Sequence, residues 1–148
     1  MQRRCAHIGV HLGSPNVPTV VHHVTVDVAD LWDDFCLTDL VAAEGALLWV
    51  TGRAAEQRGM VGIGEMARTS AAGRERFSRA QRWWSQTAGT FTGAVDELVA
   101  FMSFTYDPEH GDSVAVVPEH LIRRDGSSVT LVTTSADAAL PSESTTVP

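Results

Sequence analysis

The stretch VAFMSFTYDPEHGDSVAVVP, residues 99–118, constrains the fold more than any other part of the chain. It predicts two strands that are apolar on both faces and are joined by a polar loop. Such strands belong inside a sheet that is covered on both sides. A chain of 148 residues is long enough for one domain with a sizeable core. The question is therefore which other elements cover these two strands.

Strands are also expected earlier in the chain. The valines of residues 19–28 recur with a period of two, which predicts a strand whose apolar side is formed by Val20, Val24, Val26 and Val28. Residues 46–52 and 59–67 are typical of two short strands, and a polar segment links them.

The last predicted elements form a β-hairpin. Residues 113–124 are its first strand and residues 127–134 its second. Asp125 and Gly126 lie between them, and Asp-Gly supplies the positive φ angles of a two-residue type I′ turn. Pro118 cannot donate to a ladder of hydrogen bonds, so we expect it at a sheet edge or a bulge.

Two principal helices are predicted. Residues 28–45 carry apolar side chains at helical spacing, and Gly45 is a plausible stop. Residues 71–90 form the clearer helix, followed by a Gly- and Thr-rich link over residues 89–93. One stripe of this helix is apolar and is made of Phe77, Ala80, Trp84 and Ala88.

This order of elements predicts an α+β fold with a mainly antiparallel sheet and two principal helices. Residues 1–18 show no sustained period and are expected to be a loose N-terminal arm. Residues 19–134 form the folded region. Residues 135–148 are small, polar and flanked by proline, which predicts a disordered tail.

The charge of the chain limits its partners. The formal net charge is −7, which argues against a nucleic acid or an anionic membrane surface as the main partner. All eleven basic residues are arginines, so the chain contains no lysine. No window approaches the apolar length of a membrane span, and the protein is expected to be cytoplasmic. Cys5 and Cys36 are then expected to be thiols.

One motif resembles a dinucleotide-binding loop. GIGEMA, residues 62–67, matches G-x-G-x-x-A, but this motif requires a helix directly after it and an acidic residue about 20 positions further on. Arg82, Trp83 and Trp84 stand there instead. We therefore prefer the alternative that the glycines allow close packing or a bulge in a strand.

No metal site is complete in the sequence. Cys5, His7 and His11 form a loose cluster without a fourth zinc ligand. His22 and His23 are adjacent in a strand and therefore point to opposite faces. The remaining candidate ligands are scattered over separate strands and loops; they are His110, His120, Glu65, Glu97, Asp107 and Glu119.

No nucleophile or anion site stands out either. Cys36 lies on or beside an apolar stripe, as inert buried thiols do, and Ser103 lies inside a strand. A run of arginines is expected to be a solvated helix face supported by a Glu75–Arg79 pair; its members are Arg74, Arg76, Arg79 and Arg82. Trp83 and Trp84 cannot both face the core. The residues alone assign no catalytic, cofactor-binding or metal-binding position.

Four segments, taken in order, resemble the N-terminal part of isochorismate synthases, members of the family of chorismate-utilising enzymes. They are GMVGIGEMART, GRERFSRAQRWW, VAFMSFTYDP and SVAVVPEHLIRRDGSSVTLVTT. The resemblance covers residues 20–134, and the succession of segments carries it. The family usually has a glycine where Met102 stands and a Gly/Pro-rich loop where TGAVDEL stands, so local packing is expected to differ here.

The resemblance implies a large α/β sandwich in which a second half of the enzyme covers these strands. It also implies conversion of chorismate to isochorismate with Mg²⁺, for menaquinone or siderophore synthesis. The family's general base is a lysine that follows the matched region, and its acidic residues come later. No family catalytic position can be placed on this chain, which is expected to be inactive alone and to require no cofactor itself.

Two interpretations remain open. In the first, the chain is the N-terminal scaffold portion of such an enzyme, as a truncated copy or with its catalytic half encoded separately. In the second, it is a free-standing, non-catalytic α+β module that binds a protein partner through an exposed sheet and an exposed tryptophan.

Overall fold

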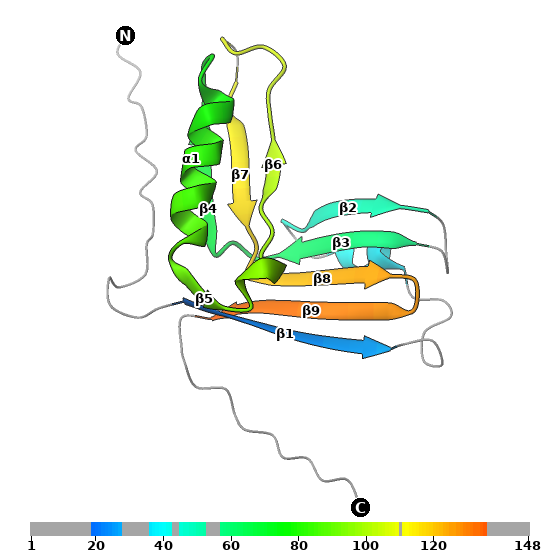
Figure 1. Ribbon diagram of the computed structural model, residues 1–148. Coiled ribbons are helices and arrows are strands. Elements are labelled where there is room, and N and C mark those ends of the chain that lie inside the picture. Colours follow the sequence, from blue (N-terminus) through cyan, green and yellow to red (C-terminus); the bar gives the residue numbers. More distant parts are fainter. Residues whose placement is uncertain (1–18, 28–35, 43–44, 53–56, 110, 136–148) are drawn as a thin grey trace, which may run out of the picture.

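The computed structural model describes residues 19–27, 36–42, 45–52, 57–109 and 111–135. They form two β-sheets and one α-helix, which confirms a mainly antiparallel α+β fold (Figure 1). The predicted arm over residues 1–18 lies outside the described residues. The same is true of the predicted tail, except for Ser135, which ends the last strand.

The larger sheet has six strands in the order β2-β3-β8-β9-β1-β5. Every neighbouring pair is antiparallel except β1 and β5, which run parallel. The strands are β1 (Thr19–Asp27), β2 (Leu47–Thr51), β3 (Arg58–Ile63), β5 (Phe91–Gly93), β8 (His120–Asp125) and β9 (Ser128–Ser135). Strand β5 lies within the segment that the sequence predicts to be only a link.

The smaller sheet has three antiparallel strands in the order β4-β7-β6. They are β4 (Ala67–Ala71), β6 (Phe101–Ser103) and β7 (Ser113–Val117). Helix α1 (Arg76–Ala88) lies along this sheet (Figure 1). In the same view, the strands of the smaller sheet rise steeply from one end of the larger sheet. The two sheets therefore meet at a corner.

The chain passes between the sheets at Gly64 and at Pro118. Gly64 has a φ of 73° and stands between β3 and β4, so the predicted strand over residues 59–67 is in fact two strands. Buried Pro118 separates β7 from β8. The prediction of one strand over residues 113–124 is thus wrong, because proline interrupts the ladder where the chain turns into the other sheet.

The core fills the corner between the sheets. Its buried members come from both sheets and from their connections; they are Val21, Phe91, Leu98, Val117, Leu121 and Val132. Trp83 and Trp84 of α1 are both half-buried and both pack against this cluster. Both tryptophans therefore contact the core, which corrects the expectation that they cannot both face it.

The predicted apolar sides of β1 and α1 are only partly buried. Val21 of β1 is buried, whereas Val24, on the predicted apolar side, is 60% exposed. On α1, Ala80 is buried as predicted, but Phe77 is 53% exposed and Arg76 is buried instead. The prediction for Phe77 fails because this first turn of the helix faces the loop after β6 and not the core.

The other predicted helix is not an α-helix in the described residues. Residues 28–35 and 43–44 lie outside the description, and Leu37–Ala42 form a 3₁₀ helix, η1. The backbone N–H of Leu37 donates to Oε1 of Gln57 at 2.6 Å, and the N–H of Asp39 donates to the carbonyl of Cys36 at 3.0 Å. These bonds fix a tight turn, and the fold contains one principal helix in its described part.

The predicted hairpin is confirmed, with its turn displaced by one residue. Asp125 pairs with Ser128 across the ladder, so the two loop residues are Gly126 and Ser127. Gly126 has a φ of 62°, which favours glycine. Asp125 stays in the strand, where its carboxylate forms an ion pair with Arg58, with 2.9 Å between Oδ1 and Nε.

Candidate interaction surface

An open apolar groove lies where an edge strand of one sheet faces an edge strand of the other. Its volume is about 490 Å³. Strand β2 is an edge of the larger sheet and β6 an edge of the smaller one. The groove is lined by Leu47, Leu48, Trp49, Met60, Val99, Ala100, Phe101, Met102, Ser103, Val114 and Val116. We call this surface the β2–β6 groove.

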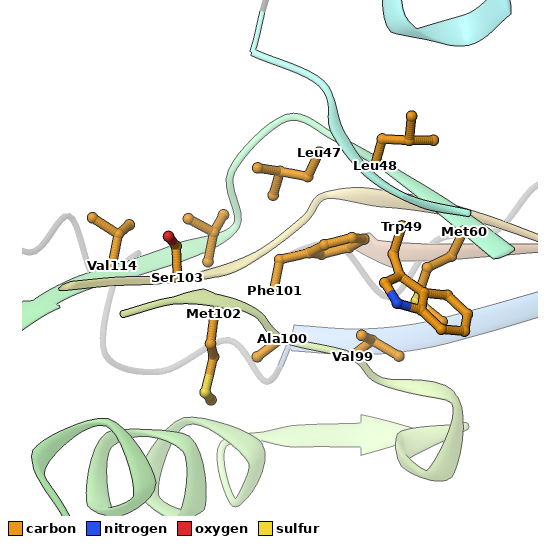
Figure 2. A pocket seen from close by; sticks show the side chains of 11 residues that line it. Leu47, Leu48, Trp49, Met60, Val99, Ala100, Phe101, Met102, Ser103 and Val114 are labelled. Atoms are coloured by element: carbon orange, nitrogen blue, oxygen red, sulfur yellow. The ribbon is translucent and has the colours of Figure 1, made fainter. Parts of the chain in front are cut away.

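Side-chain directions in the groove follow the alternation of strand β6. Figure 2 shows Phe101 and Ser103 on one side of β6 and Met102 on the other. The ring of Phe101 points toward Trp49 and Met60, which are register partners on β2 and β3. Trp49 is 56% exposed, a large value for an indole beside an apolar pocket. The rings of Phe101 and Trp49 therefore lie in the groove without an element that covers Trp49 in the described residues.

Two glycines of β3 make this arrangement possible. A Cβ at Gly62 would lie 2.9 Å from the ring of Phe101 and 3.0 Å from Cβ of Pro118. Gly59 has a φ of 154°, and a Cβ there would lie 2.2 Å from the carbonyl oxygen of Trp49. Gly59 thus allows close approach of a neighbouring strand, and Gly62 allows close approach of a ring, which supports the packing interpretation for Gly62 of the motif.

The dinucleotide interpretation fails on the same segment. Strand β4 follows Gly64, where a phosphate-binding motif requires the start of a helix. Helix α1 begins only at Arg76. No pyrophosphate-binding helix end is therefore formed at GIGEMA.

The groove contains no charged lining residue, and one ion pair involves the register neighbour of a lining residue. Arg123 is the register partner of Met60, and its Nη1 donates to Glu97 Oε2 at 2.6 Å. An apolar surface with a polar border is the pattern of protein interfaces. The groove can bind an uncharged segment, but it has few groups that could orient a polar substrate.

The acidic residues considered as candidate metal ligands do not lie close to one another. Glu65 pairs with Arg68, and Glu97 pairs with Arg123. Asp107 Oδ1 accepts a hydrogen bond from the backbone of Glu109, and Glu119 lies beside His120. Within the described residues no three histidine, cysteine or carboxylate groups come close enough to hold a metal ion.

The histidine and cysteine candidates are also separate. His22 and His23 occupy successive positions of β1, and the first is half-buried while the second is exposed. His120 approaches Thr133 Oγ1 at 3.5 Å. Cys36 is half-buried rather than buried, which corrects the expectation of a buried thiol. Cys5, His7, His11 and His110 lie outside the described residues.

The arginine run divides into one buried and several exposed residues. Arg79 pairs with Glu75 at 3.9 Å on the solvated face, as predicted. Arg76 is only 9% exposed, and its guanidinium donates to the carbonyls of Gly73 and Tyr106. It also lies over the ring of Phe77 at 4.5 Å. Arg76 therefore connects α1 to the loop after β6.

The resemblance led us to expect altered packing around Met102, where the family has a glycine. Met102 does not crowd its neighbours. It lies on edge strand β6 and is 40% exposed. The groove residues that sequence reasoning missed are Leu47, Trp49 and Met60. Leu47 and Trp49 lie on edge strand β2 and Met60 on the neighbouring strand β3, and only the meeting of the two sheets brings them to the groove.

Comparison of the chain with protein-family models, curated proteins and solved structures finds no match. Within the described part of the chain, no helix has the length and apolarity needed to cross a membrane.

Proposed function

We propose that this chain is the non-catalytic N-terminal portion of an isochorismate synthase-like enzyme and that its β2–β6 groove binds the catalytic portion. Chorismate and Mg²⁺ would then be held by the catalytic portion. The role of this chain is to scaffold that portion and to help enclose its substrate pocket.

The open groove is the observation that carries the proposal. Trp49 is 56% exposed and Met102 is 40% exposed, beside a pocket of about 490 Å³ without charged lining residues. Exposed apolar surface of this kind marks a binding site in soluble proteins. The four resembling segments between residues 20 and 134 indicate which partner to test.

The test mixes the chain with the catalytic portion of an isochorismate synthase, produced as a separate polypeptide that carries the lysine-bearing strand and the metal-binding glutamates. We expect a 1:1 complex by light scattering. We also expect isochorismate formation, with Mg²⁺ present, to exceed that of the catalytic portion alone. The chain by itself should convert no chorismate.

Trp49→Ala measures how much the groove contributes. Truncation of an aromatic side chain at the centre of an interface lowers the binding free energy by about 2 kcal/mol or more. The dissociation constant of the complex should therefore rise by at least about thirtyfold. Arg79→Ala is the matched control, because Arg79 lies on the solvated face of α1. Equal affinity of Trp49→Ala and the unaltered chain would remove the groove from the interface.

A free-standing interaction module is the second candidate, and the core favours it. Six buried residues from both sheets form a core cluster within the described residues. If this core suffices, the chain alone unfolds cooperatively as a soluble monomer. If the scaffold proposal holds, the catalytic portion raises the midpoint of this unfolding, because it binds only the folded chain, whereas a free-standing module is not stabilised by it.

A further inference from the structure

We propose that the Asp125–Gly126 pair, at the turn of the β8–β9 hairpin, is a modification site where the aspartate is converted spontaneously to isoaspartate. The turn leaves this aspartate open to the reaction, and the ion pair with Arg58 slows the reaction. Neither Asp125 nor Gly126 lines the β2–β6 groove, so the modification does not depend on the partner proposed for that groove.

The reaction is a rearrangement of the peptide bond between Asp125 and Gly126. The backbone nitrogen of Gly126 attacks Cγ of the protonated Asp125 carboxyl; an N–Cγ bond forms, and the carboxyl hydroxyl leaves with the amide proton as water. Water then opens the resulting cyclic imide. Cleavage of the N–Cγ bond restores aspartate, whereas cleavage between the nitrogen and the main-chain carbonyl gives isoaspartate, with Cβ in the main chain. The water that leaves is replaced by the water that enters, so the reaction needs no oxidant, reductant or cofactor.

The hairpin turn leaves room for this ring closure. The Asp125 side chain is 69% exposed. Gly126 has no side chain, and apart from its chain neighbours no atom lies within 4 Å of the place where a Cβ would stand. Asp125 pairs with Ser128, so Gly126 lies in the turn and outside the ladder. The nitrogen of Gly126 is therefore not held by a neighbouring strand.

The structure protects a second aspartate that a small residue follows. Within the described residues this second pair is Asp112–Ser113. Ser113 begins β7, pairs with Ala71 of β4 and is 2% exposed. Its nitrogen becomes available to the Asp112 carboxyl only when this end of the smaller sheet opens, and opening of a packed sheet costs free energy. The modification is thus selective for the hairpin turn.

Arg58 opposes the reaction at Asp125. The two residues are register partners on β3 and β8, and Nε of Arg58 lies 2.9 Å from Oδ1 of Asp125. This pair directs the carboxylate toward β3, whereas ring closure requires it to turn toward Gly126. Ion pairs between exposed side chains contribute little free energy. Arg58 therefore slows the reaction without preventing it.

Isoaspartate changes the hairpin because it adds a backbone atom at position 125. The pairing of Asp125 with Ser128 then shifts. Arg124 is 4% exposed, and its Nε donates to the carbonyl of Gly126 at 2.9 Å. The longer backbone moves this acceptor away from a buried donor, which destabilises the fold. The modified chain should therefore unfold at a lower urea concentration than the unmodified chain.

Incubation of the chain in water labelled with oxygen-18 measures the reaction, because opening of the imide adds a labelled oxygen atom to residue 125. The chain is then digested in ordinary water, and mass spectrometry locates the label and distinguishes isoaspartate from aspartate by backbone fragmentation. We expect label in the peptide that contains Asp125 and at least about tenfold less in the peptide that contains Asp112. Equal labelling of both peptides, or none at Asp125, would overturn the proposed site.

Variants test the ring closure and the role of Arg58. Asp125→Glu keeps the charge but would have to close a larger, less favourable ring, so it should carry no label; label there would overturn the mechanism. Arg58→Ala should raise the labelling rate at Asp125 by about threefold. Arg68→Ala removes another exposed pair, with Glu65, and should leave that rate unchanged.

The peptide that contains Asp112 separates loss of the ion pair from loss of the fold. An unfolded variant gains label at both aspartates, whereas loss of the Arg58 pair raises the label at Asp125 alone. An unchanged or lower rate at Asp125 in Arg58→Ala would overturn the protective role of Arg58.

Discussion

Strands β6 and β7 come from the same apolar stretch, yet their environments differ. Four of the five residues of β7 are buried, whereas Met102 and Ser103 of β6 are exposed. Strand β7 has a neighbour on each side, and β6 has one. The difference shows that an apolar strand is buried only when both its edges and its faces are covered.

The strongest test of this comparison puts the same charge on both strands. Val117→Asp buries a carboxylate at a site that is 0% exposed and should lower the free energy of unfolding by about 4 kcal/mol or more. Met102→Asp, at an exposed position, should change it by less than about 0.5 kcal/mol. Urea unfolding followed by tryptophan fluorescence measures both. Similar losses would mean that β6 is as buried as β7.

A smaller effect is expected from the glycine under the ring of Phe101. Gly62→Ala brings a methyl group to 2.9 Å from this ring and should cost about 2 kcal/mol through overpacking. Gly89→Ala is the control, because a Cβ there has its nearest contact at 3.4 Å and the backbone is right-handed. If both variants are equally stable by thermal unfolding, the ring does not lie over β3 as described.

The smallest effect concerns the attachment of the loop after β6 to α1. Arg76→Ala removes two hydrogen bonds to carbonyls and should cost about 1.5 kcal/mol. Arg79→Ala removes an exposed pair at 3.9 Å and should cost less than about 0.5 kcal/mol. Limited proteolysis in this loop should accelerate for Arg76→Ala only. Equal rates for the two variants would show that Arg76 does not hold the loop.

Local patterns in the sequence predicted most element types in the described residues. The stretch 71–90 contains α1, and the Asp-Gly pair lies at the β8–β9 hairpin. The crossings at Gly64 and Pro118 were not predicted, because the apolar pattern continues on both sides of each residue. A period of two has the same appearance whether a strand stays in one sheet or enters another.

The candidate site was predictable only in part. The sequence indicated that residues 99–106 and 113–118 need a cover, and the structure adds that β6 lacks one in the described residues. The participation of Trp49 and Met60 could not be predicted, since both belong to another sheet and lie some 40 or more positions earlier in the chain. Pairing between distant strands depends on how the sheets meet.

The sequence by itself determined most of the strand segments and the helix α1, because periodicity and turn residues act between close neighbours in the chain. The tertiary structure decided that Val21 is buried while Val24 is exposed, and that β7 is central while β6 is an edge. These choices depend on contacts between residues far apart in sequence. Burial of a side chain depends on the whole tertiary structure. An apolar residue in the sequence therefore indicates that burial is favourable, but not which other residues bury it.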